Sequence, residues 1–279
     1  MTLRAPAKLN LCLYLGPRRQ DGLHELRSLF CPLTLADRVV VVDAEEDEVV
    51  CRPDVAGPNL ADEALAALRR SGWGRRPVRV EIEKRIPVAA GLGGGSADAA
   101  AVLRLAVDQV DAIAAIAAEL GADVPSQLEP AFALVGGAGE TVEPLPEPAH
   151  FGVVLVPGAE GLATAAVYAE ADRLGLGRSA SELEGIAGRL REAASGGASP
   201  LAYAELLVND LGDAALSLRP EIAAGLTALE EAGAAATLVA GSGPTAVGLF
   251  EDIAAADRAA GALSPRYAGA IVAAPGSGL

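Results

Sequence analysis

The segment Pro87-Val-Ala-Ala-Gly91-Leu-Gly93-Gly94-Gly95-Ser96-Ala-Asp98 carries the most structural information in this 279-residue chain. Five of the nine residues from Pro87 to Gly95 are glycine or proline, which excludes regular secondary structure there. Alanine and leucine then predominate, so a helix is expected from Ser96 to about Val110. Closely spaced glycines turn successive N–H groups into one concavity, and the positive end of the helix points the same way. The segment therefore predicts a phosphate-binding loop.

A flexible loop whose following helix is capped by Ser96 is the alternative interpretation. Two familiar phosphate motifs are excluded. Walker A requires Lys directly before the Ser, where Gly95 stands. The dinucleotide fingerprint requires glycine at its sixth position, where Ser96 stands, and a βαβ frame. A side chain at Gly94 is expected to occupy the space meant for phosphate.

Strands are expected around this loop. Alternation of apolar and polar residues predicts a half-buried strand over residues 9–15 and another over 78–83. Residues 39–42 form a short β-branched run before an acidic loop, and a strand closes at 136–139. A second helix is expected over residues 112–120, ending at Gly121.

Prolines at 144, 146 and 148 mark a change of pattern, and a domain boundary is predicted there, giving domains 1–148 and 149–279. Beyond it, strands are expected at residues 151–156, 237–240, 245–250 and 270–274. Helices are expected at 164–174, 183–190, 222–229 and 252–263. Strands and helices mix without a repeating βα unit. This favours an α+β fold in both halves over a doubly wound parallel sheet.

Composition narrows the function. The chain has 22 Lys and Arg against 37 Asp and Glu, which argues against a nucleic-acid coat protein but not against an anionic small molecule. Three cysteines without a CxxC pair and only two histidines disfavour a Cys/His metal site and favour a reducing compartment. No secretory pattern and no apolar run of roughly 18 residues is visible, so a cytoplasmic location away from membranes is expected.

Three further features are each weak alone. Lys8 begins an expected strand, where a lysine is usually a surface residue. Asp123 follows a helix end, where Asp usually bonds its own backbone in a turn. The sequence Gly241-Ser242-Gly243-Pro244 lies between two strands and is compatible with a simple tight hairpin.

Taken in order along the chain, these segments resemble the GHMP kinase superfamily, which includes galactokinase, homoserine kinase, mevalonate kinase and phosphomevalonate kinase. The resemblance covers the whole chain. The segments that carry it are residues 6–11 (PAKLNL), 19–25 (RQDGLHE), 91–100 (GLGGGSADAA), 120–125 (LGADVP), 209–211 (NDL) and 241–245 (GSGPT).

The resemblance implies a two-domain α+β fold, with an N-terminal domain similar to ribosomal protein S5 domain 2 and a ferredoxin-like C-terminal domain. It implies ATP as co-substrate, with Mg²⁺ arriving on the nucleotide and no metal ligand identified. The Asp-Gly-x-His-Glu segment resembles the one found in a single branch of the superfamily. Enzymes of that branch phosphorylate the 2-hydroxyl of a cytidine-diphosphate-linked methylerythritol in the non-mevalonate isoprenoid pathway. Partners other than this small molecule (nucleic acid, a membrane or an obligate protein) are not expected.

By the same resemblance, Lys8 and Asp123 form the catalytic pair. Asp123 would accept the hydroxyl proton, and Lys8 would polarise the same oxygen. ATP would lie on Pro87, Val88, Ala89, Ala90, Gly91, Leu92, Gly93, Gly94, Gly95, Ser96 and Ala97. The residues expected to bind the acceptor substrate are Asn10, His24, Tyr168, Gly241 and Ser242.

The chain departs from the family pattern at Leu23, where an aromatic residue is usual, at Ser126 and Gln127, at Ala240 and at Ala97. These departures concern the grip on the substrate and leave the catalytic pair intact. Three alternatives remain: another kinase of the superfamily, a nucleotide-binding protein without catalysis, and a Rossmann-type dehydrogenase. The Asp-Gly-Leu-His-Glu segment disfavours another kinase of the superfamily. The presence of both Lys8 and Asp123 disfavours a protein without catalysis, and the missing sixth glycine disfavours a dehydrogenase.

Overall fold

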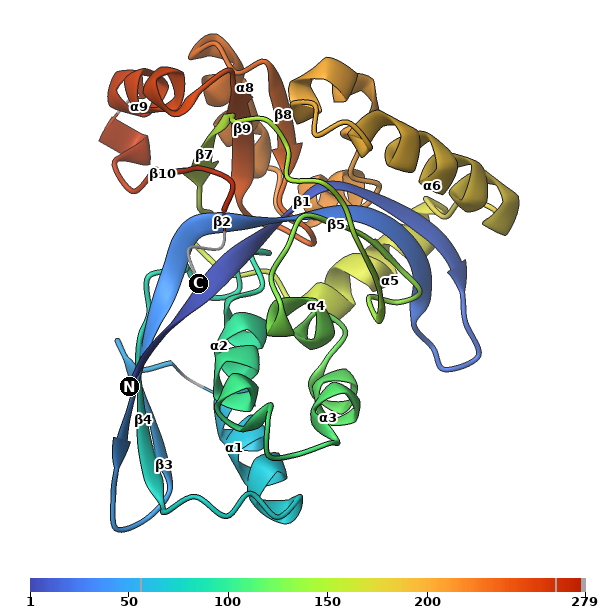
Figure 1. Ribbon diagram of the computed structural model, residues 1–279. Coiled ribbons are helices and arrows are strands. Elements are labelled where there is room, and N and C mark those ends of the chain that lie inside the picture. The colour runs from blue at the N-terminus through green and yellow to red at the C-terminus, as the bar shows by residue number, and fades with distance from the viewer. Residues whose placement is uncertain (56, 264, 277–279) are drawn as a thin grey trace.

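The computed structural model describes residues 1–55, 57–263 and 265–276. It contains two sheets, one built from the first half of the chain and one from the second (Figure 1). Within the described residues, no helix combines the length and the apolar composition needed to cross a lipid bilayer.

The first sheet is organised by a long, bent antiparallel hairpin of β1 (Thr2–Arg18) and β2 (His24–Asp43), which runs across the middle of the molecule in Figure 1. Its other strands are β3 (Glu48–Arg52), β4 (Val78–Glu83), β5 (Ala133–Gly136) and β6 (Thr141–Pro144), in the order β3-β4-β2-β5-β6. Only the β3–β4 pairing is parallel. The hairpin belongs to the first half of the chain, and it extends far enough to pack against the second half.

Four helices pack beside this sheet: α1 (Leu60–Arg70), α2 (Gly94–Leu103), α3 (Ile113–Leu120) and α4 (Val124–Leu128). Helix α2 is buried almost all round, and alanines at 97 and 99–101 let α1 and the sheet approach its backbone closely. A short 3₁₀ turn at Arg104–Ala106 follows α2. The buried α2 gives the segment that precedes it a rigid support.

The second sheet has the order β10-β7-β9-β8 and is antiparallel throughout: β7 (Gly152–Val156), β8 (Ala236–Val239), β9 (Ala246–Phe250) and β10 (Ile271–Ala273). Helices α7 (Gly212–Leu218), α8 (Ile222–Glu231) and α9 (Ile253–Ala262) belong to this half, with 3₁₀ turns at Pro200–Leu206 and Pro265–Tyr267. Helices α5 (Thr164–Leu174) and α6 (Ala180–Ala194) extend towards the β1–β2 hairpin.

The two halves share one hydrophobic core. Leu9 and Leu29 of the hairpin belong to the same buried cluster as Leu155 of β7 and Leu190 of α6. The Tyr14 hydroxyl donates to the carbonyl of Leu206 at 2.9 Å. The predicted boundary after residue 148 falls in the link between β6 and β7 and stays a proposal.

The α+β class is confirmed, and two local predictions are wrong. The strand at residues 9–15 is buried on both faces instead of one, because the second half of the chain covers the face expected to meet solvent; Asn10 is 1% exposed. The helix predicted from Ser96 to Val110 begins at Gly94 and ends at Leu103. It begins early because Gly93 takes a left-handed φ of 67° and turns the chain into the helix.

Candidate active site

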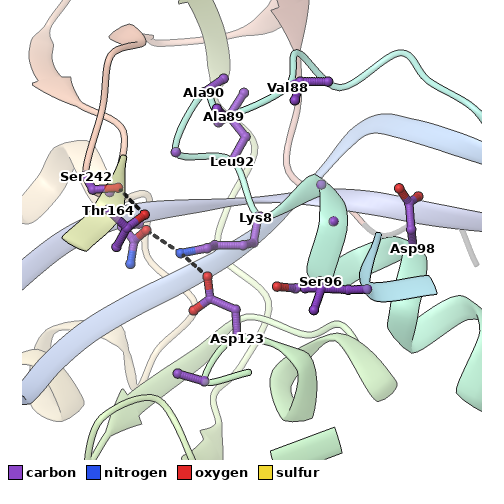
Figure 2. A pocket seen from close by; sticks show the side chains of 18 of the residues that line it. Lys8, Val88, Ala89, Ala90, Leu92, Ser96, Asp98, Asp123, Thr164 and Ser242 are labelled. Atoms are coloured by element: carbon purple, nitrogen blue, oxygen red, sulfur yellow. Dashed lines mark hydrogen bonds and ion pairs between the residues drawn. The ribbon is translucent and has the colours of Figure 1, made fainter. Parts of the chain in front are cut away.

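A cavity of about 510 Å³ opens where the two halves meet (Figure 2). Its wall contains all but the last residue of the glycine loop, which we define as residues 87–97, together with Lys8 and Asp123. Thr164, Tyr168, Gly241 and Ser242 come from the second half. At its far end it is lined by Cys51, Val55, Pro58, Asn59 and Leu60, which the sequence analysis did not identify. The cavity therefore joins nearly all the sequence-predicted site residues.

At Gly91 the glycine loop adopts a backbone conformation that requires glycine. Gly91 has a φ of 78°, and a Cβ there would lie 2.1 Å from the carbonyl oxygen of Ala240. The N–H of Lys8 donates to the carbonyl of Leu92 at 3.0 Å. The loop is thus hydrogen-bonded to β1 on one side and packs closely against the Gly241 turn on the other.

The loop leads into the N-terminus of α2. Gly93 is the N-cap and offers no side-chain hydrogen bond, so the first N–H groups of α2 are left for water or a ligand. Ser96 is the third helical residue and not the cap that the alternative interpretation assumed. The arrangement can hold an anion at the helix N-terminus.

Neighbouring glycines differ in where a side chain would point. A Cβ at Gly94 would meet Ile86 Cγ2 at 3.1 Å and Lys84 Nζ at 3.3 Å, so it would press on the protein first. The expectation that it would simply fill the phosphate space is wrong. A Cβ at Gly95 would have only Leu60 Cδ1 within 4 Å, at 3.9 Å. Gly95 itself is exposed on the cavity wall.

Lys8 and Asp123 face each other across the cavity floor, with Lys8 Nζ 3.2 Å from Asp123 Oδ2 (Figure 2). Lys8 is only 7% exposed and is therefore not the ordinary surface lysine. Asp123 makes no side-chain cap to α4, so it is not the ordinary turn aspartate either. Its carboxylate is about one-third exposed, which keeps it open to a ligand. The pair sits beside the glycine loop.

The second half contributes hydroxyls and a glycine turn. Thr164 Oγ1, on the first residue of α5, lies 3.1 Å from Ser242 Oγ. Asn209 Nδ2 donates to the carbonyls of Val239 and Gly241, each at 2.7 Å, and so holds the turn in place. Sequence reasoning missed Thr164, for which an expected helix start was the only signal.

Of the two predicted base-binding residues, Tyr168 of α5 lies on the cavity wall and His24 lies outside it, behind the Tyr168 ring. Tyr168 lines the cavity and its ring centroid lies 5.6 Å from that of His24. His24 is nearly buried behind it, with Nδ1 3.1 Å from the Gly16 carbonyl and Nε2 3.2 Å from Asp172 Oδ1. Burial, and then the charge of Asp123, raise the pKa of Tyr168 to about 12, so its hydroxyl stays protonated at neutral pH.

A buried charge cluster, which no sequence pattern indicated, supports the start of the glycine loop. Lys84 Nζ donates to Asp37 Oδ2 and, at 2.6 Å, to Asp98 Oδ2. Asp37 Oδ1 accepts from the backbone N–H groups of Arg85 and Ile86, just before Pro87. Burial raises the pKa of Asp98 to about 7, with Lys84 opposing the shift and Asp37 adding to it. The pKa of Lys84 is raised, because the two carboxylates outweigh its burial.

The cluster predicts a pH dependence of stability. A carboxyl whose folded pKa is raised stabilises the fold while protonated, and that contribution is lost as pH rises through the folded value. Asp98→Asn stays neutral, so we expect its unfolding free energy to gain on wild type as pH increases from about 4 to about 8. Thermal midpoints at both ends of this range measure the difference. Parallel pH profiles for the two proteins would contradict it.

The described part of the chain contains no group of three His, Cys, Asp or Glu side chains placed to hold a metal ion. The carboxylates on the cavity wall are Asp98, which is buried against Lys84, and Asp123, which is partly exposed. Because Asp98 is already paired with Lys84, an ion bound here would take its ligands mainly from substrate phosphates and water, as Mg²⁺ does.

Family models match most of the chain. The model described as the GHMP kinases N terminal domain matches residues 59–137, and that of the GHMP kinases C terminal matches residues 187–269. A protein of Kineococcus radiotolerans named 4-diphosphocytidyl-2-C-methyl-D-erythritol kinase is 42% identical, over 96% of this chain and 86% of that protein. A protein of the same name from Anaeromyxobacter dehalogenans is 43% identical, over 95% and 85%.

Solved structures agree with this. A crystal structure of 4-(cytidine 5'-diphospho)-2C-methyl-D-erythritol kinase matches with a TM-score of 0.79 and 35% identity, covering 99% of this chain and all of that one. A homoserine kinase from Cytophaga hutchinsonii matches with a TM-score of 0.71 at 18% identity, covering 99% of this chain and 94% of that one. The second likeness concerns the fold alone.

Proposed function

The chain belongs to the GHMP kinase family, and we propose that it transfers the γ-phosphate of ATP to the 2-hydroxyl of 4-diphosphocytidyl-2-C-methyl-D-erythritol in the cytoplasm. As a member of this family it is a kinase, and the names of its relatives support this acceptor and the non-mevalonate isoprenoid pathway. The observation that carries the reaction is the Lys8–Asp123 pair, 3.2 Å apart beside the glycine loop.

On the donor side, residues 87–97 hold the triphosphate of ATP. The uncapped N-terminus of α2 and the left-handed backbone at Gly91 and Gly93 support this role, because both turn N–H donors to an anion without intervening side chains. The apolar far end of the cavity, around Val55 and Leu60, suits the flat face of the nucleotide base.

On the acceptor side, Asp123 takes the proton of the attacking hydroxyl. A bond then forms between that oxygen and the γ-phosphorus, and the bond to the β-phosphate bridging oxygen breaks, so that ADP leaves with the electron pair. Lys8 stabilises the negative charge that spreads over the transferred group. Positioning of the two reactants supplies much of the remaining rate enhancement.

The acceptor is bound by Asn10, His24, Tyr168, Gly241 and Ser242. Tyr168 offers a ring for stacking on the cytosine, and Ser242 a hydroxyl near its diphosphate. Both ring nitrogens of His24 already have partners in the free protein. We propose that the base displaces Asp172 from Nε2 when it binds.

Mg²⁺ would arrive with the nucleotide and be held by phosphate oxygens and water, and Asp123 would stay free to accept the hydroxyl proton. The ion would neutralise part of the charge on the phosphates. This chain's own residues orient the hydroxyl and carry its proton.

Stacking on the cytosine should depend on one aromatic ring. Leu23, where relatives usually carry an aromatic residue, is 51% exposed and offers only apolar contact. Tyr168→Ala should raise KM for the cytidine substrate by roughly 5- to 100-fold, the equivalent of roughly 1–3 kcal/mol of stacking. Leu23→Tyr should lower the same KM.

Steady-state kinetics with each substrate varied in turn test this. KM for ATP serves as the control and should change by less than about twofold in both variants. A Tyr168→Ala enzyme that loses ATP affinity and keeps its KM for the cytidine substrate would place the base pocket elsewhere.

A coupled assay of ATP turnover tests the function as a whole. The panel contains the cytidine-linked erythritol, homoserine, mevalonate and galactose, each with Mg²⁺. Turnover only with the first supports the proposal. Turnover with another alcohol would make the chain a different kinase of the family. Tight ATP binding without turnover on any alcohol would argue for a nucleotide-binding protein that has lost catalysis.

A further inference from the structure

From Lys8, an unbroken series of hydrogen bonds runs into the β1–β2 hairpin through two polar side chains and ends on a backbone carbonyl. Lys8 Nζ donates to Asn10 Oδ1 at 2.7 Å, and Asn10 Nδ2 donates to Ser28 Oγ at 2.8 Å. Ser28 Oγ then donates to the carbonyl of Cys12. Lys8, Asn10 and Ser28 are 7%, 1% and 0% exposed, so water does not substitute for these partners.

The Cys12 end of this hydrogen-bond series lies at an irregularity in the strand pairing. Asn10 lies opposite Phe30 but Cys12 lies opposite Leu29, so β1 carries one extra residue between them. The carbonyl of Cys12 is turned to Ser28 at this point, and the N–H of Leu29 donates to Cys12 Sγ. The bulge thus supplies a fixed acceptor to the Ser28 hydroxyl.

The donor and acceptor roles follow from that one carbonyl. A carbonyl can only accept, so the Ser28 proton must point at Cys12. The Ser28 oxygen can then only accept from Asn10, which must present its NH₂ group there. The amide oxygen of Asn10 is left facing Lys8, whose ammonium can only donate. Each role in the series is forced by the one before it.

We propose that Ser28 is a positioning residue that sets the orientation of the Asn10 amide, and through it the place of the Lys8 ammonium. If the amide turned over, its NH₂ group would face the ammonium and repel it. Beside Asn10, the Phe30 ring, whose centroid lies 4.3 Å from Lys8 Nζ, covers a second side of the ammonium, and Asp123 lies on a third. This inference rests on the proposed role of Lys8 in phosphoryl transfer.

Ser28→Ala removes the proton that starts the series. We expect kcat to fall about tenfold, the usual value of one fixed hydrogen bond to a charged centre, with KM for ATP within about twofold of wild type. Ser195→Ala is the matched control, because Ser195 Oγ also donates to a main-chain carbonyl, that of Glu192, outside the cavity wall. A merely structural effect of Ser28 would lower the thermal midpoint without separating kcat from KM.

A double-mutant cycle with Asn10→Asp tests the orientation itself. A carboxylate accepts at both oxygens, so it faces Lys8 correctly without help from Ser28 but competes with Cys12 for the single Ser28 proton. Adding Ser28→Ala to Asn10→Asp should therefore cost no further kcat, and it should lower the thermal midpoint by less than Ser28→Ala does in the wild-type background, because it removes one hydrogen bond instead of two. An equal tenfold loss in both backgrounds, or none in either, would overturn the inference.

Two results separate this inference from the proposed function. The first is the change in thermal midpoint that Ser28→Ala causes with and without Asn10→Asp. It requires no turnover, so it reports on the amide orientation even if Asn10→Asp is inactive. Lys8→Met reports on the chemistry. A fully active Lys8→Met enzyme would refute the catalytic role of Lys8, whereas an inactive one with a wild-type Ser28→Ala would refute only the role of Ser28.

Discussion

Asp123→Asn is expected to reduce kcat by roughly 10²- to 10⁴-fold, the range for loss of a general base, while ATP affinity stays close to wild type. The amide fills the same space but cannot take up the hydroxyl proton. The side chain of Asp123 pairs with Lys8, which lies outside the glycine loop, so the donor site should be undisturbed. Single-turnover kinetics and nucleotide titration measure the two quantities separately.

Lys8→Met should cause a loss of similar size, and the double variant should be little worse than either single one. The two side chains act on one oxygen, so their effects are not additive. Glu119→Gln is the control, because Glu119 is an exposed carboxylate on α3, a few residues before Asp123. Wild-type turnover in Asp123→Asn would refute the assignment of the base.

Gly95→Val should lower nucleotide affinity by about 100-fold or more, the equivalent of about 2.7 kcal/mol. Its backbone is helical and its Cβ position is open, so a side chain enters the cavity without displacing protein atoms. The branched group would then compete with the ligand for the space in front of the α2 N-terminus. Titration with an ATP analogue measures the loss.

The matched control is Gly188→Val. Gly188 is also helical and exposed, with no atom within 4 Å of a Cβ, but it lies on α6 away from the cavity. Both variants should cost similar helix stability, so their thermal midpoints should move together. Equal ATP affinity in the two proteins would favour the plain flexible loop over a phosphate site.

Local patterns were sufficient where a segment buries one face and exposes the other. The alternation at residues 78–83 predicted β4 with the bounds that the structure shows, and the start at Thr164 and the end at Leu174 predicted α5. The density of glycine in the loop, and its place before a helix, predicted the part of the cavity that depends on the backbone alone. The resemblance to the kinases supplied the pairing of Lys8 with Asp123, which no local pattern contains.

Features formed by segments that lie far apart in the chain could not be predicted from local sequence patterns. Residues 9–15 alternate like a surface strand, and only the second half of the chain explains why both faces are buried. Lys84, Asp37 and Asp98 come from three elements, and each alone resembles an ordinary charged residue. The bulge opposite Ser28 depends on strand register, which a run of apolar residues on both strands leaves open.

The two contacts that hold the glycine loop in place, with β1 and with the Gly241 turn, have a consequence for conformational entropy. Fixing the backbone of a free residue costs roughly 1–2 kcal/mol, and a loop rich in glycine would lose the most. Here the hydrogen bond from the N–H of Lys8 to the Leu92 carbonyl, and the close packing of Gly91 against Ala240, hold the loop in its shape in the folded protein. The incoming nucleotide therefore meets a shape that already exists, and its contacts contribute to affinity instead of to ordering the chain. Because Ala240 belongs to the second half, the first half alone would lack this preorganisation.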